Sequence, residues 1–305
     1  MPLNRRQFIA AGAIWLAGTA SGELTAGHGG HLTLGTRHAA IGLDSHQFPQ
    51  GRTASPIAAI YSGLTGIDRT GVVVPSLAAW YEPNQNLRVW TFRLRHGALF
   101  HNGREVEAQS VKQNILRWRG GSDPIDRIDI LDKYTVRLTL SLPDAALPAR
   151  MMHGLQAPDS FHQAKDHPIG TGPFKLVSWK RHDETRLTRF ENYWETDTKG
   201  IALPYLDAIT AHYKPEPESR YTELRTGGVD MVDTLTPLQT TSIQRDDSAR
   251  FHLWQVHVGC ILLGFNWRTG PFQDQRLRLA AALAVDRDTL HRAVFFAQGA
   301  ILNQP

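Results

Sequence analysis

The chain has 305 residues, which is enough for two domains of ordinary size. Its 33 basic and 29 acidic residues give a net charge of +4, and they form no long basic run. This pattern does not favour a nucleic-acid partner. The single cysteine, Cys260, excludes an intrachain disulfide and any zinc site built from several cysteines.

The first 26 residues predict an export signal. Arg5 and Arg6 precede a short apolar stretch, residues 9–20, which ends in small residues and is too short to span a bilayer. Paired arginines in this place resemble the twin-arginine class, which exports folded proteins through the Tat translocase. A general secretory signal that carries two arginines is the alternative. We expect cleavage after Ala20 or Ala26. We expect no lipid anchor, because no cysteine stands directly after the apolar stretch.

Hydrophobic periodicity predicts both strands and helices in the remaining chain. Alternation or buried apolar runs predict strands at residues 31–36, 89–95, 132–140, 174–179, 185–190, 209–213, 251–256 and 259–266. Apolar residues at helical spacing, or helix-start signals, predict helices at residues 55–67, 107–118, 216–226, from 236 onward, 274–285 and 288–296. Gly227 is the expected left-handed terminator of the third helix.

Histidines invite two chemical hypotheses. His28, His31, His38 and His46 suggest a metal site, but they lack helical i, i+4 spacing, so a chance excess is the preferred interpretation. His101 suggests a general base, but no carboxylate or hydroxyl beside it in the sequence completes a catalytic group. We therefore interpret His101 as a turn histidine that bonds its own loop.

One motif organises the comparison with known families. Gly170-Thr171-Gly172-Pro173-Phe174 leads into a strand that carries Trp179. Other motifs occur in a fixed order around it: Pro75 to Trp80 (PSLAAW), Leu94 to Gly103 (LRHGALFHNG), Asp132 to Leu140, Asn192 to Trp194 (NYW), Pro204 to Asp207 (PYLD), Leu263 to Asn266 (LGFN) and Pro271 to Arg287. Together they resemble the family 5 extracellular solute-binding proteins, the peptide/nickel class that serves ABC importers.

The resemblance implies an α/β fold of the periplasmic binding protein type II-like kind (class C). The expected divisions are a twin-arginine signal peptide (1–26), a first-lobe α/β core (27–50 and 168–262), an inserted subdomain (51–167) and the start of a second lobe (263–305). Because family members continue beyond this point, we expect a truncated product or a fragment. In a fragment, the apolar side chains of the last two predicted helices would lack packing partners, which favours aggregation. These side chains include Leu277, Leu283, Leu290 and Phe295.

The resemblance also implies a function without catalysis or cofactor. The protein would be a monomer in the periplasm that binds a peptide-like or other small solute between two lobes and delivers it to a membrane ABC permease, by hinge closure. The expected cleft residues are Arg37 and His38, after the first strand, and His257, Gly259 and Cys260, which enter the second lobe. The Gly170 to Phe174 motif marks the return from the inserted subdomain and is not expected to bind the solute.

Two alternatives remain open from the sequence. One is a Tat-exported enzyme that binds a cofactor or metal, although no zinc-helix motif, dinucleotide glycine pattern or nucleophile elbow is present. The other is a periplasmic sensor or a non-transporting remnant that keeps only the first lobe.

Overall fold

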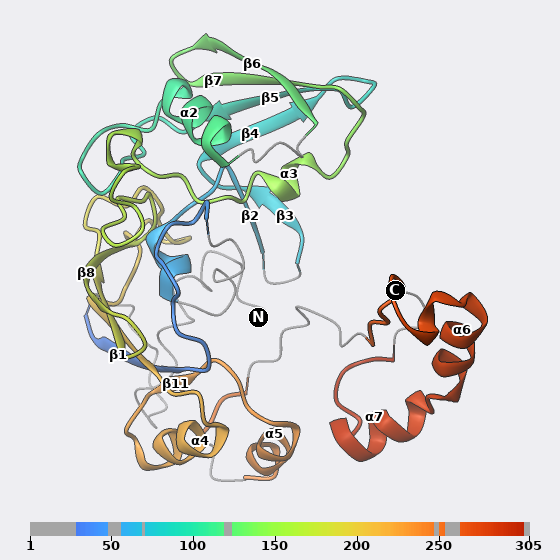
Figure 1. The fold of residues 1–305 in the computed structure, drawn as a ribbon. Helices are drawn as coiled ribbons and strands as arrows, with labels where there is room; N and C mark the ends of the chain where they lie inside the picture. The colour runs from blue at the N-terminus through green and yellow to red at the C-terminus, as the bar shows by residue number, and fades with distance from the viewer. Residues whose placement is uncertain are drawn as a thin grey trace. The chain divides into compact units, whose positions relative to one another are not determined.

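The computed structural model describes residues 29–47, 56–68, 71–118, 124–246, 250–253 and 263–301. The chain divides into two compact units, Met1–Thr234 and Leu235–Pro305 (Figure 1). Within the described ranges, no helix is both long enough and apolar enough to cross a bilayer. The predicted export signal, with Arg5 and Arg6, lies outside them.

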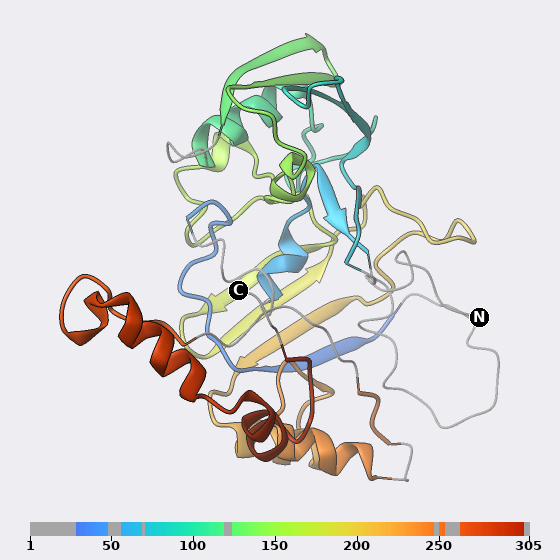
Figure 2. The same ribbon diagram turned by 90° about the vertical axis from the view of Figure 1, so that its right-hand side faces the viewer.

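A five-stranded mixed sheet forms one part of the first unit. Its order is β11-β1-β10-β9-β8, with β1 parallel to both β11 and β10, and β10 antiparallel to β9. Figure 2 shows β1, in blue, beside β10, in orange. The strands are β1 (His31–Thr36), β8 (Phe174–Lys180), β9 (Glu184–Arg189), β10 (Ala208–Tyr213) and β11 (Met231–Val232). The first strand of the chain therefore pairs with strands from much further along it.

A four-stranded antiparallel sheet, in the order β4-β5-β7-β6, forms another part of this unit. Helix α2 (Ala108–Trp118) packs against β6 and β7 (Figure 1). The strands are β4 (Ala78–Pro83), β5 (Val89–Leu94), β6 (Ile125–Asp132) and β7 (Thr135–Leu140). On β5, Trp90, Phe92 and Leu94 alternate into a core whose buried members all lie between Leu64 and Ala157.

Shorter elements complete the first unit. They are the 3-10 helices η2 (Pro56–Ile60) and η3 (Pro158–Ser160), helices α3 (Leu147–Arg150) and α4 (Pro217–Thr226), and the hairpin of β2 (Thr65–Ile67) with β3 (Val73–Pro75). Helix α4 ends as the sequence predicts, because Gly227 takes a left-handed conformation with φ of 79°.

The second unit contains α5 (Pro237–Gln244), η4 (Pro271–Gln273), α6 (Gln275–Ala284) and α7 (Arg287–Phe295). Thr236 and Gln239 form a reciprocal capping box at α5. Among the apolar residues expected to lack partners, Leu277, Leu283 and Leu290 are 46%, 76% and 44% exposed, so they contribute little to a core. Phe295 differs, because it is half-buried.

The Gly170 to Phe174 motif lies where three segments meet. The Gly172 N–H donates to Ile60 O (2.9 Å), and the Thr171 hydroxyl accepts the Ser62 N–H (3.1 Å) and donates to Ser62 O (3.0 Å). The His101 N–H donates to Gly170 O (2.9 Å). These bonds connect the motif to the end of η2, to the residues just after it, and to the turn after β5.

The predicted helix at residues 55–67 is wrong. Only η2 is helical, and the chain then extends into β2. The apolar spacing identified buried residues correctly, but Ile57 and Ile60 belong to one core whereas Leu64 belongs to the other. The Ser62 carbonyl accepts tertiary bonds from Leu155 and Thr171, so the backbone here pairs with distant segments and not with itself.

Other boundaries also differ from the sequence-based expectation. The strand predicted from Asp132 begins at Thr135, because Asp132 ends β6 and residues 133–134 form the turn. The described parts of the strands expected at residues 251–256 and 259–266 have no regular secondary structure. The other predicted strands and helices occur within a few residues of the expected bounds.

The two glycines of the motif give a direct test of this packing. A Cβ on Gly170 would lie 2.0 Å from Ile60 O, and one on Gly172 would lie 2.4 Å from Ala59 O. We expect Gly170→Ala and Gly172→Ala each to lower the free energy of unfolding by at least ~2 kcal/mol in urea titrations, because backbone must move.

Gly228→Ala is the control, because its Cβ would meet nothing closer than Glu223 Cβ at 3.4 Å. It should change the free energy of unfolding by less than ~1 kcal/mol. Equal effects at all three positions would contradict the close approach.

Candidate functional site

Arg37 and His38, the cleft residues expected after β1, are both exposed. The backbone N–H of Arg37 donates to both carboxylate oxygens of Asp233, at 3.1 Å each, and the Asp233 N–H donates to Gly35 O (3.2 Å). Asp233 therefore fixes the backbone at the end of β1 and leaves the Arg37 side chain at the surface. His257, Gly259 and Cys260 lie outside the described residues.

The histidine metal hypothesis finds no support among the residues that the structure describes. No group of three or more His, Cys, Asp or Glu side chains there could hold a metal ion. The ring Nε2 of His31 lies 2.8 Å from Thr210 Oγ1, and His46 belongs to a different cluster. His28 lies outside the described residues.

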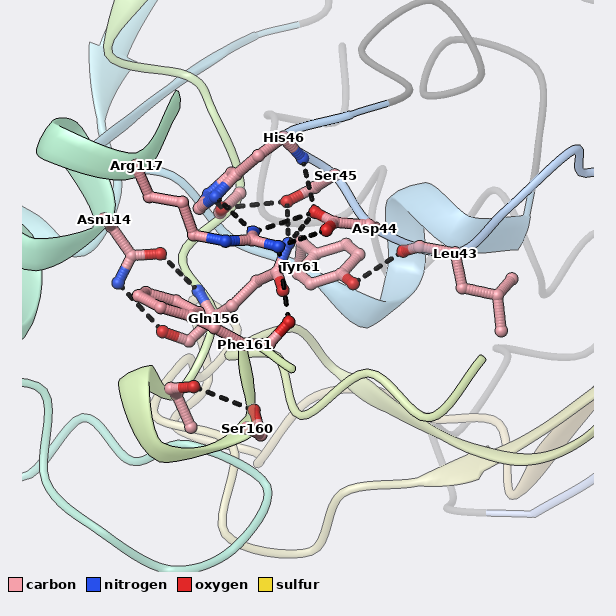
Figure 3. Close-up of polar contacts among 12 residues, drawn as sticks. Leu43, Asp44, Ser45, His46, Tyr61, Asn114, Arg117, Gln156, Ser160 and Phe161 are labelled. Carbon is pink, nitrogen blue, oxygen red and sulfur yellow. Dashed lines mark hydrogen bonds and ion pairs between the residues drawn. The ribbon is translucent and has the colours of Figure 1, made fainter. Parts of the chain in front are cut away.

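A buried polar cluster, which we call the Arg117 cluster, joins the loop after β1 to the end of α2 (Figure 3). It consists of Asp44, His46, Arg117 and Gln156. The Arg117 guanidinium donates to both oxygens of Asp44 and to His46 Nδ1 (2.8 Å), and Gln156 Nε2 donates to Asp44 Oδ1 (2.7 Å). The Asp44 side chain is 1% exposed and that of Arg117 is 21% exposed.

The partners in the Arg117 cluster fix its charge state. Burial alone would raise the pKa of Asp44, but hydrogen bonds from Arg117 and Gln156 outweigh burial and hold this pKa below its ordinary value. Burial lowers the pKa of His46 to about 4, and the charge of Arg117 adds to the effect. Neutral His46 accepts at Nδ1 from Arg117 and donates from Nε2 to Gly154 O (3.0 Å).

Aromatic side chains border the cluster. The rings of His46 and Trp118 are 5.9 Å apart edge to face, those of Trp118 and His153 are 4.5 Å apart, and the Arg117 guanidinium lies 4.6 Å from the Phe161 ring centre. Asp44 and Gln156 are buried, whereas Arg117, His46 and the bordering aromatic side chains are half-buried. The arrangement places the Asp44–Arg117 ion pair beside several aromatic rings, so the cluster has both polar and apolar surfaces.

His101, the candidate base, is a structural residue. Its Nε2 donates to Gly172 O at 3.0 Å, and its ring lies 5.0 Å from that of Phe190. Burial lowers its pKa to about 4. The sequence-based expectation was that His101 bonds its own loop. This is wrong, because the bond partner of the His101 ring is Gly172, in the Gly170 to Phe174 motif.

The Arg117 cluster was not identified from the sequence. Asp44 and Arg117 are ion-pair partners far apart in the chain, and neither stands in a local motif that predicts burial. The only available signal was an arginine in the last turn of a predicted amphipathic helix, which also fits an ordinary helix-end charge.

Comparisons with solved structures define the class of protein. The chain is similar to AgaA of A. tumefaciens R10, in complex with agropinic acid, with a TM-score of 0.77 and 25% identity over 90% of this chain and 58% of that one. It is similar to NikZ of Campylobacter jejuni, in complex with Ni(L-His), with a TM-score of 0.75 and 19% identity over 90% and 57%. The fold is the α/β fold of type II-like periplasmic binding proteins.

The sequence then gives the family. A profile of the bacterial extracellular solute-binding proteins, family 5 Middle, matches residues 72–305, so the chain belongs to this family. A relative named glutathione-binding protein GsiB, from Pectobacterium atrosepticum, is 26% identical over 317 residues, covering 97% of this chain and 59% of the relative. GsiB of Salmonella paratyphi A is 26% identical over 253 residues, covering 77% and 48%. The chain thus spans about half the length of these relatives.

The Asp44–Arg117 pair predicts a large stability effect. Arg117→Met should lower the free energy of unfolding by about 3 to 5 kcal/mol, since it leaves a buried carboxylate without its cation. In a double-mutant cycle, Asp44→Asn with Arg117→Met should lose less than the sum of the single variants.

The exposed pair Arg104–Asp159 is the matched control, with side chains 66% and 48% exposed and a 2.8 Å separation. Arg104→Met should change stability by less than ~1 kcal/mol. A loss at Arg117 no larger than this would contradict a supporting role for the cluster.

The two buried histidines predict acid sensitivity. Folded His46 and His101 stay neutral to about pH 4, whereas an unfolded histidine takes up a proton below its model value of 6.5. The free energy of unfolding should therefore fall between these two pH values, by roughly 3 kcal/mol for each histidine, and level off below. Urea titrations across this range measure the slope.

Exposed His162 supplies the control for this slope. His46→Gln and His101→Gln should each flatten the pH dependence, whereas His162→Gln should leave it unchanged. Identical slopes in all variants would show that the two histidines titrate alike in folded and unfolded chains.

Proposed function

We propose that the chain supplies the first lobe, and the start of the second, of the periplasmic solute-binding component of an ABC importer. The family match over residues 72–305 carries this proposal. The mechanism would be closure of two lobes over a solute, with no covalent step. The relatives named above are called binding proteins, which also supports a protein that is not an enzyme.

We assign the parts of the chain accordingly. Residues 27–50 and 168–262 would form the first-lobe core, and the pairing of β1 with β10 supports this division. Residues 51–167 would form the inserted subdomain, supported by a core that lies between Leu64 and Ala157. Residues 263–305 would begin the second lobe, and residues 1–26 would be the signal that directs export by the Tat translocase.

A peptide-like solute suits the proposed site. The relative named for glutathione, and a solved dipeptide-binding protein from Pseudoalteromonas in complex with Met-Leu, support this class. The exposed Arg37 could pair with a carboxylate of such a solute, and His38 lies beside it. His257, Gly259 and Cys260 would contribute from the segment that enters the second lobe. The protein would act as a monomer and deliver the solute to its membrane permease.

Native mass spectrometry of the chain purified from the periplasm without unfolding tests the proposal. We expect an additional mass of a small molecule, and isothermal titration with glutathione and with Met-Leu should then identify which class competes for the site. Arg37→Gln should weaken binding of the retained solute about tenfold, because it removes a charge-assisted bond.

Arg137, exposed on β7, supplies the control for charge alone. Arg137→Gln should leave solute affinity unchanged. A chain that carries no small molecule and binds neither probe would contradict a solute-binding role for this chain, and equal losses in both variants would reject Arg37 as a contact.

A further inference from the structure

A surface pocket lies beside β4 and β5, within the first unit, and the proposed solute cleft does not use it (Figure 1 shows both strands). Its volume is about 380 Å³, which falls in the range of pockets that hold small ligands. It is lined by Ala79, Trp80, Arg93, Leu94, Arg95, His96 and Trp194. One unit supplies all of these residues, so the pocket does not depend on a second lobe.

The pocket combines cations with large aromatic surfaces. Trp80 and Arg93 are direct cross-strand partners in the β4–β5 register, and Trp80 is 40% exposed. Arg93 and His96 are also exposed. The Arg95 guanidinium lies 4.4 Å from the Trp194 ring centre, while its Nε donates to Ser76 O at 2.6 Å. Arg95 is therefore held in place as one wall, and Arg93 is the cation that faces solvent.

The acidic groups near the pocket leave its positive character in place. The Glu105 carboxylate accepts hydrogen bonds from Lys133 Nζ (2.8 Å), from the Tyr134 hydroxyl and from the Gly97 N–H (2.8 Å). Asp132 interacts electrostatically with Arg93, but it accepts the Tyr134 N–H at 2.7 Å. A ligand carboxylate that approaches Arg93 would thus compete with one exposed acid.

The backbone at the pocket is irregular in a way that aims side chains. The β4–β5 register shifts between Ala78 and Trp80, so Ala79 is the extra residue of a β-bulge. Bulges re-aim the side chains next to them and often lie beside binding sites. Here the bulge puts the exposed Trp80 next to the exposed Arg93.

The second tryptophan of the pocket has an unused polar group. The indole Nε1 of Trp194 is buried and has no acceptor among the described residues.

We propose that this pocket is a second binding site, for a small aromatic carboxylate. The ring of such a ligand would lie against Trp80 and Trp194, and its carboxylate would pair with Arg93. A planar anion uses both features at once, whereas a simple inorganic anion would use only the cation and a neutral ring only the indoles. This proposal is independent of the solute-binding function.

Titration with benzoate, followed by NMR of the tryptophan indole N–H signals, tests the proposal on the full chain. The Trp80 and Trp194 signals, assigned from Trp80→Phe and Trp194→Phe, should shift saturably with benzoate. Benzamide, which is neutral, and acetate, which lacks a ring, should each bind at least about tenfold more weakly.

Arg93→Gln should weaken benzoate binding about tenfold, whereas Arg137→Gln, at an exposed arginine that does not line the pocket, should leave it unchanged. No saturable shift of either indole up to ~10 mM benzoate would overturn the proposal. Equal affinity for benzoate and benzamide, which needs no variant, would also overturn it.

Discussion

Backbone contact between residues 60–62 and residues 170–172 is the constraint on which the first unit depends. The Gly172 N–H and the Thr171 hydroxyl bond to Ile60 and Ser62, at a separation that leaves no room for a Cβ on Gly172. The chain reaches this point from β1 on one side and enters β8 on the other. Because residues 60–62 and 170–172 are bonded to each other, both ends of the segment between them are fixed at one place. This segment contains its own hydrophobic core, between Leu64 and Ala157.

The Arg117 cluster is a second long-range connection within the first unit. It ties the loop after β1, through Asp44, to the end of α2, through Arg117. Asp44 and Thr171, which anchor these two connections, are buried, while Arg37 and His38 lie exposed at the end of β1. Loss of either partner of the Asp44–Arg117 pair would leave a charge without its counter-ion, so the pair favours one arrangement of the two segments that it joins. The residues that hold these segments together are thus different from the exposed Arg37 and His38.

The sequence predicted the elements that follow from local pattern. Strand β1 has the expected bounds, and Gly227 ends α4 as expected, because alternation and left-handed glycine are local signals. Residues 55–67 had helical spacing but divide between two cores, and the bonds that extend them come from positions about 100 residues away. The Asp44–Arg117 pair could not be found for the same reason, because its two residues are far apart in the sequence and come together only when the chain folds. For the binding site, only the exposed placement of Arg37 and His38 could be compared with the expectation.

Native-state hydrogen exchange tests most directly whether the contact between residues 60–62 and residues 170–172 holds the first unit together. If the contact holds the first unit together, the amides of Ser62, His101 and Gly172 should exchange only through the same slow opening as the central amides of β1 and β5, with the same free energy. The contradictory result would be fast exchange at these three amides while both sheets remain protected. That outcome would mean that each sheet is stable without the junction.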